Sequence, residues 1–302
     1  MGAPAPTCPR IAPPPHSMKP SSLCRHLLPG ILTWALHPTP TLGQHVHVNA
    51  GTVSPEAGAA LTFVNRASFA EESRFVIHLR PWESPLYGPI FRGGSDLTFT
   101  ALPATPDNGG PSPRAALPGT RIAAIVESVS GPTGGTFSFW DSFDGFFDAT
   151  EITFTLPTGT SGGTNRFLLS ENDGSPGADP YGHIHGRKFS ATRRGVYRVG
   201  LRLVDDALNG PGNGPTQAPS DPIVFLFQAG LTLSVVSLQD GKATVQFGTE
   251  LNRTYRLEAT STLGPAAAWK PVGEPLVGTG RLETVAGLPA ADPETFFRLR
   301  EE

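Results

Sequence analysis

The feature that most constrains this chain is an apolar pattern of period two that returns from residue 60 to residue 227. Alternating apolar and polar side chains, rich in β-branched and aromatic types, are typical of half-buried strands. Gly and Pro, 35 and 32 of the 302 residues, lie between these runs and mark turns. The pattern predicts an all-β fold, a β-sandwich or jelly roll. The predicted strands are 60–64, 74–79, 96–100, 121–127, 136–140, 151–156, 166–169, 195–204 and 223–227.

A second set of short strands follows a boundary near Gly230. About seventy residues are enough for a small independent β-sandwich. We therefore expect a β-sandwich domain over residues 44–229 and a small C-terminal β domain over residues 230–302. The predicted strands of the second domain are 231–238, 242–247, 253–257, 269–272, 281–285 and 295–300.

Residues 1–43 have the pattern of a disordered extension followed by a bacterial signal peptide. Basic side chains precede the apolar stretch 27–36, which is too short and too interrupted by Pro to span a bilayer. Small residues favour cleavage after Gly43, and cleavage after Gln44 is the alternative. The start is Met1 or Met18. The other interpretation of the apolar stretch is a buried strand. We expect a secreted protein, at the cell surface or in the periplasm.

Charge and cysteine content narrow the range of functions. The chain has 23 Lys and Arg against 26 Asp and Glu, a formal net charge of −3. Residues 1–43 hold three basic residues and no acidic one, so the remainder has 20 basic and 26 acidic residues, or −6. This balance argues against nucleic acid or an anionic membrane as a partner. Because Cys8 and Cys24 are the only cysteines, a metal bound beyond residue 43 needs His, carboxylate or main-chain ligands.

Histidine pairs are the main candidate for chemistry. Five histidines follow residue 43, and four of them form His45-Val46-His47 and His183-Ile184-His185. On a strand, residues i and i+2 share a face, so each pair can present two imidazoles to one zinc or copper ion. If the pairs lie on neighbouring strands, His45, His47, His183 and His185 form a metal site. The alternative is that one pair lies in a fraying chain terminus and the other in a hydrogen-bonded loop. The fifth histidine, His78, lies in an Ile/Leu strand and is expected to be structural.

The cleavage site gives the metal hypothesis a second form. Cleavage after Gln44 would make His45 the free N-terminus, where its amine and imidazole could chelate copper together. Cleavage after Gly43 leaves Gln44, whose cyclisation would block the amine. The small-residue rule ranks this form below a site built from several histidines.

Two further segments have a weaker chemical signal. Glu171, Asp173 and Asp179 resemble an oxygen-rich calcium loop, but they lack the EF-hand spacing, so a turn is expected and calcium is not. The aromatic and acidic run 140–148, together with Trp82, could form a platform for a sugar. Such a run is more typical of sandwich core.

A family resemblance adds to the histidine pattern. The second pair, followed by Phe189-Ser190-Ala191-Thr192 and Arg194-Gly195-Val196-Tyr197-Arg198-Val199, resembles the "choice-of-anchor" class of bacterial surface domains. Arg187-Lys188 stand where a Trp is common in that class. Some members of the class belong to the zinc-uptake regulon, so the resemblance implies a role in zinc handling. Segments 254–260 and 296–300 resemble a small β module found at the ends of exported bacterial proteins.

Taken together, the residues predict a non-catalytic, exported metal-binding module. No P-loop, dinucleotide-binding glycine pattern or His-Glu-X-X-His helix is present in the sequence. The carboxylate that usually follows the His-X-His of cupin enzymes is missing after His47 and His185. Two alternatives stay open: a structural or adhesive surface protein without metal, and a sugar-binding or cupin-like enzymatic domain. The expected partners are a metal ion and cell-surface components, with no membrane span after signal removal.

Overall fold

The computed structural model describes residues 46–94, 97–141, 151–290 and 294–302. Residues 43–302 form one compact unit. Apart from four single 3₁₀ turns, the regular structure of the described residues is β-strand, which confirms the all-β class. None of the described helical segments is long and apolar enough to cross a bilayer. The predicted signal, residues 1–43, lies outside the described residues.

The smaller of the two sheets built from residues 46–229 has four strands in the order β11-β5-β1-β2. Strand β5 lies in its middle, parallel to β1 and antiparallel to β11. The parallel pair brings together two segments about fifty residues apart, as parallel strands require a long connection. The strands are β1 (Val46–Thr52), β2 (Leu61–Phe63), β5 (Leu97–Ala101) and β11 (Gly182–Ile184).

The larger sheet has ten strands in the order β10-β6-β13-β14-β3-β4-β12-β7-β8, with β9 also paired to β6. Long β13 in its centre alternates buried and exposed residues along much of its length, as a strand with one buried face does. The strands are β3 (Val76–Ser84), β4 (Gly88–Gly93), β6 (Ile122–Ser130), β7 (Thr136–Trp140), β8 (Phe154–Pro157), β9 (Thr160–Ser161), β10 (Arg166–Leu168), β12 (Lys188–Ala191), β13 (Gly195–Asp205) and β14 (Ile223–Ala229).

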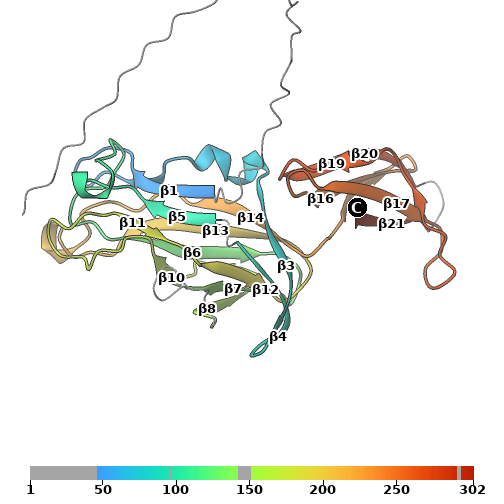
Figure 1. Ribbon diagram of the computed structural model, residues 1–302, viewed down its shortest axis with the longest axis horizontal. Helices are drawn as coiled ribbons and strands as arrows, with labels where there is room; N and C mark the ends of the chain where they lie inside the picture. The colour runs from blue at the N-terminus through green and yellow to red at the C-terminus, as the bar shows by residue number, and fades with distance from the viewer. Residues whose placement is uncertain (1–45, 95–96, 142–150, 291–293) are drawn as a thin grey trace, which may run out of the picture. The chain divides into compact units, whose positions relative to one another are not determined.

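The two sheets lie face to face (Figure 1). Aromatic side chains fill the core between them. Phe99 of β5 lies between them, with its ring centroid 5.5 Å from that of Phe167 and 6.1 Å from that of Phe225. Phe189 contributes a further edge-on contact to Phe99 at 6.4 Å. Edge-to-face and offset contacts of this kind stabilise an aromatic core beyond the area it buries. The packing of the two faces confirms the predicted sandwich.

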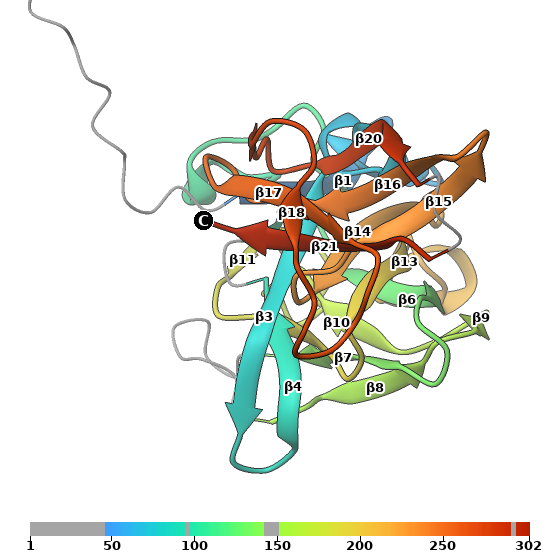
Figure 2. The ribbon, with the colours of Figure 1, turned by 90° about the vertical axis from the view of Figure 1, so that its right-hand side faces the viewer.

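The C-terminal strands form two further sheets (Figure 2). Their side chains build a separate apolar cluster. One sheet has the order β15-β16-β20; in the other, β17 pairs with β18 and β19 along one edge and with β21 along the opposite edge. Tyr255 and Phe247 lie in their shared core. The strands are β15 (Ser234–Gln239), β16 (Lys242–Gly248), β17 (Thr254–Thr260), β18 (Lys270–Pro271), β19 (Leu276–Val277), β20 (Leu282–Pro289) and β21 (Phe296–Glu301).

A buried glutamine connects the first set of strands to the second. The Gln228 side chain accepts a hydrogen bond from the Gly248 amide at 2.6 Å and donates one to the Gly248 carbonyl at 3.3 Å. Gln228 therefore pairs with both the N–H and the C=O of Gly248, as a neighbouring strand would. A Cβ at Gly248 would lie 2.6 Å from the Gln228 side-chain oxygen, so a larger residue there would displace Gln228 from these hydrogen bonds.

The aromatic core predicts a large effect of truncation at its centre. Phe189→Ala removes a side chain that is 1% exposed and leaves a cavity between the sheets. We expect it to lower the free energy of unfolding by about 3–5 kcal/mol. Leu208→Ala, at a position that is 70% exposed, is the control and should change it by no more than about 0.5 kcal/mol. Equal effects in urea denaturation would contradict this assignment of the core.

Candidate functional site

The register of the small sheet brings the two histidine pairs together. His47 of β1 lies opposite Thr98 of β5, and His183 of β11 lies opposite Thr100. Since successive residues of a strand point to opposite faces, Phe99 enters the core while its two threonine neighbours face outward. Both histidines therefore lie on the outer face of the sheet, on either side of β5.

One hydroxyl group links the two histidines. Thr100 Oγ1 lies 2.9 Å from Nδ1 of His47 and 3.2 Å from Nδ1 of His183. The ring centroids of these two histidines are 4.8 Å apart, and His185 lies 4.5 Å from His183. Thr100 is buried, whereas the three imidazoles are half-buried and reach solvent. Three of the four predicted ligands thus form one cluster, and the fourth, His45, lies outside the described residues.

The hydroxyl determines which ring nitrogens are available. A threonine hydroxyl has one proton to donate and two lone pairs to accept with. When both imidazoles donate Nδ1–H to Thr100, both Nε2 atoms are unprotonated and carry their lone pair. When Thr100 donates to one ring instead, that ring carries its own proton on Nε2. The same three side chains therefore support two tautomeric arrangements.

A close backbone approach fixes the strand that carries the second pair. A Cβ at Gly182 would lie 1.8 Å from the carbonyl oxygen of Leu169, so only glycine fits. The Glu171 amide donates to the carbonyl of Tyr181 at 2.9 Å, and the Glu171 carboxylate accepts from the His183 amide at 3.1 Å. These contacts hold β11 against the 169–171 segment and place the Glu171 carboxylate at the backbone of His183.

A buried arginine, Arg187, follows the second histidine pair in the sequence. Arg187, 2% exposed, donates from Nε to Asp141 at 2.8 Å and lies 5.5 Å above the ring of Phe167. Burial lowers the pKa of the Arg187 guanidinium, and the negative charge of Asp141 opposes that shift. Arg187 is thus part of an ion pair packed on an aromatic ring.

The cluster is held by hydrogen bonds and does not form a ready coordination shell. Across residues 46–94, 97–141, 151–290 and 294–302, no three His, Cys, Asp or Glu side chains converge closely enough to hold a metal ion as they stand. Two of the rings direct Nδ1 to Thr100 instead. A bound metal would have to use the other ring nitrogen and draw the rings closer together.

The acidic loop near the second pair is engaged in its own turns. Asp173 accepts from the Ser175 amide at 2.9 Å, and Asp179 accepts from the Ala104 amide at 2.8 Å and from Asn108 Nδ2 at 3.0 Å. Burial acts to raise the pKa of Asp179, but the hydrogen bonds outweigh it and hold that pKa below its usual range. These contacts make both side chains part of the loop structure.

The predicted aromatic platform is also structural where it is described. Trp140 is completely buried, and its indole donates to Ser190 Oγ at 2.8 Å. The guanidinium of Arg92 lies 4.4 Å from the ring of Trp140 and 4.5 Å from that of Trp82. Trp140 therefore has no open face on which a sugar could stack, and residues 142–148 lie outside the described residues.

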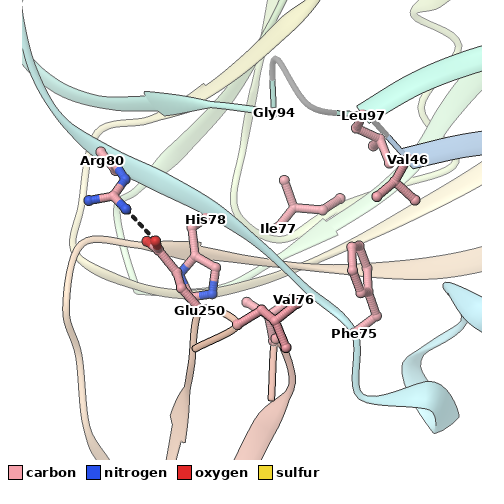
Figure 3. Close-up of a pocket in the computed structure, with 11 residues that line it drawn as sticks. Val46, Phe75, Val76, Ile77, His78, Arg80, Gly94, Leu97 and Glu250 are labelled. Atoms are coloured by element: carbon pink, nitrogen blue, oxygen red, sulfur yellow. Dashed lines mark hydrogen bonds and ion pairs between the residues drawn. The ribbon is translucent and has the colours of Figure 1, made fainter. Parts of the chain in front are cut away.

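The fifth histidine lines a pocket of about 400 Å³ (Figure 3). His78 Nε2 lies 3.1 Å from the carbonyl oxygen of Thr249, and its Nδ1 lies 3.9 Å from the Glu250 carboxylate, which also pairs with Arg80. Apolar side chains such as Ile77 line the opposite wall. Burial lowers the pKa of His78, against the opposing charge of Glu250. The contacts fit the structural role expected from the sequence.

The fold and this cluster define an all-β protein that presents imidazoles on the outer face of a small sheet. No protein family, curated protein or solved structure matches the chain. The segment Gly159–Gly163 has the spacing of a Gly-X-Ser-X-Gly nucleophile motif. Ser161, however, lies on β9, paired with β6, rather than on the strand-to-helix turn that such a nucleophile needs.

The lowered pKa of His78 predicts a pH-dependent stability. The folded protein binds fewer protons at this site than the unfolded chain does when the pH is between the lowered pKa and about 6.5. The free energy of unfolding should therefore fall as the pH drops below about 6.5. His78→Gln keeps an N–H for the Thr249 carbonyl but cannot titrate, so it should lose less stability.

Urea denaturation at about pH 7.5 and about pH 5.5, on either side of the reference histidine pKa, measures the difference between the two proteins. The other histidines titrate equally in both and cancel in this comparison. Identical losses for the wild type and His78→Gln would refute the proposed protonation linkage.

Proposed function

We propose that this chain is an exported, non-catalytic module that binds zinc or copper through the cluster of His47, His183 and His185. The observation that carries the proposal is that His47 and His183, from distant parts of the sequence, share the Thr100 hydroxyl with their rings 4.8 Å apart. Imidazole nitrogen is a preferred ligand of both metals.

The hydrogen bonds to Thr100 supply the orientation that a ligating imidazole needs. Metal-bound histidines nearly always donate their second ring N–H to a nearby acceptor. Thr100 has two lone pairs, one for the Nδ1–H of each ring. Both rings would then bind the metal through Nε2, on the side away from the hydroxyl. Binding a common ion then requires the half-buried rings to rotate until their Nε2 atoms meet at it.

Further ligands complete the proposed site. His185, whose ring lies 4.5 Å from that of His183, is the third imidazole. His45, two residues before His47 in the sequence, is the fourth ligand in this proposal. Structural zinc is almost always bound by four ligands, whereas three leave a position for water. The contribution of His45 therefore decides whether the site is closed.

Export and surface location belong to the same proposal. Residues 1–43 have the features of a signal peptide, and residues 44–302 contain no cysteine. A site made only of imidazole is insensitive to the oxidation that destroys thiolate ligands outside the cytoplasm. The proposal also agrees with the zinc handling that the resemblance to the choice-of-anchor domains implies.

Metal titration of residues 43–302, with zinc alone and with copper alone, tests the proposal. We expect one equivalent to bind in calorimetry and in elemental analysis after dialysis. His47→Ala and His183→Ala should weaken binding by more than about 100-fold, beyond the usual effect of losing a hydrogen-bonding partner of a ligand. His78→Gln is the matched control and should bind as the wild type does.

Failure of both metals to bind stoichiometrically would exclude the metal-binding function. It would favour a structural or adhesive surface protein instead. Equal weakening by His78→Gln and His183→Ala would also contradict the assigned site. His45→Ala separates a four-ligand site, where affinity falls, from a three-ligand site, where it does not.

Removal of the Thr100 hydroxyl should also weaken metal binding. Thr100→Val keeps the shape of the side chain but removes the acceptor for both Nδ1–H groups, so metal affinity should fall by about 10–100-fold. Thr100→Ser keeps the hydroxyl and should bind within a few-fold of the wild type. If both variants bind equally well, Thr100 does not orient the ligands.

A further inference from the structure

Strand β15 is an edge strand that neither charge, Pro nor short length protects. All six of its residues, Ser-Val-Val-Ser-Leu-Gln, are exposed, and among the described residues β16 is its only partner strand. Val235, Val236 and Leu238 are 56%, 49% and 63% exposed. The strand contains no charged residue, Pro or Gly. Its outer edge therefore offers free main-chain groups flanked by aliphatic side chains.

Two of these side chains belong to the core face of the sheet. Val235 is paired with Val245, and Leu238 with Ala243, and both partners are buried in the core of the C-terminal strands. Directly paired residues share a face, so Val235 and Leu238 point to the same side as that core. A register shift between Val235 and Ser237 puts them on the same face although they are three residues apart. The core of these sheets is thus left open along β15.

The other terminal strands of the described sheets differ from β15. Strands β2, β9, β10, β11, β18 and β19 have three residues or fewer. Strand β8 ends in Pro157, β20 carries Glu283, and β21 carries Arg298 and Arg300. Short length, Pro and charge are among the features that keep edge strands from pairing with other chains. Among the described terminal strands, β15 combines six residues with a free, uncharged edge.

We propose that β15 is the interface through which two copies of this chain pair, edge to edge and antiparallel about a twofold axis. The pairing joins two β15-β16-β20 sheets into one continuous sheet and covers the open end of each core. This inference is independent of the proposed metal site, since it uses none of its residues.

The sequence of β15 is suited to pairing with itself. A twofold axis between Val236 and Ser237 sets Val235 opposite Leu238 and Ser234 opposite Gln239 of the second copy. The two aliphatic pairs then lie on the core face, and the polar pairs lie at the ends. A twofold interface must be complementary to itself, and an uncharged strand meets its copy without like-charge repulsion. This match identifies a second copy as the occupant.

Paired charge substitutions test the interface and its register. In Val235→Lys/Leu238→Lys, each lysine of one copy lies opposite a lysine of the other, so the dissociation constant should rise by about tenfold or more. In Val235→Lys/Leu238→Glu, each lysine lies opposite a glutamate, so association should return and weaken with added salt. The control is Leu208→Lys/Leu263→Lys, at two exposed positions outside β15, and should associate as the wild type does.

Sedimentation velocity of residues 43–302 over about 10 µM to 1 mM resolves a weak interface of this kind. The proposal expects a concentration-dependent dimer of the wild type, loss of that dimer with two lysines, and recovery with the lysine–glutamate pair. A monomeric wild type across this range would overturn it. So would undiminished association of the two-lysine variant, or no recovery in the charge-swapped variant, with all proteins shown to be folded by circular dichroism.

Discussion

The position of β5 between β1 and β11 is the constraint on which the rest of the structure depends. Its alternation sends Phe99 into the aromatic core and Thr98 and Thr100 to the outer face. The same strand therefore anchors the sandwich and sets the spacing of the imidazole cluster. Register is fixed wherever one face of a strand is buried, because a slip of one residue would reverse every side chain. Burial of Phe99 thus holds Thr100 between His47 and His183.

The backbone around the cluster is held by close contacts and hydrogen bonds, whereas the three imidazoles reach solvent. Gly182 allows β11 to lie against the 169–171 backbone, and the Glu171 carboxylate accepts from the His183 amide. On β1, Asn65 donates to the His47 carbonyl at 2.8 Å. The backbone on both sides is therefore pinned, while the imidazoles are only half-buried. Such a combination favours ligand binding, because less conformational entropy is lost on binding when the strands that carry the ligating side chains are already fixed.

Much of the fold followed from the sequence because the period-two pattern reports burial directly. The strand predicted over 136–140 is β7 as observed, and those predicted over 195–204 and 223–227 match β13 and β14 within two residues. Strand β4 was not predicted, because Gly88 and Pro89 lie in it and have the signature of a turn. Tertiary pairing with β3 and β12 overrides that local preference.

The candidate site could be predicted only in part. The i, i+2 spacing predicted that His47, His183 and His185 would lie together, as they do. The parallel pairing of β1 with β5 leaves no signal in the local sequence. Thr100 was missed for that reason, since nothing in residues 97–101 shows which strands will flank it.

Nitrogen-15 NMR of the imidazole rings is the most direct measurement of the central claim. In residues 43–302 without metal, each ring bonded to Thr100 carries its proton on Nδ1 or on Nε2, according to whether it donates to the hydroxyl or accepts from it. With one equivalent of zinc, both His47 and His183 should carry their proton on Nδ1 and show metal-shifted Nε2 resonances. Unchanged spectra, or a protonated Nε2 on either ring at saturating zinc, would contradict a metal site built on the shared threonine.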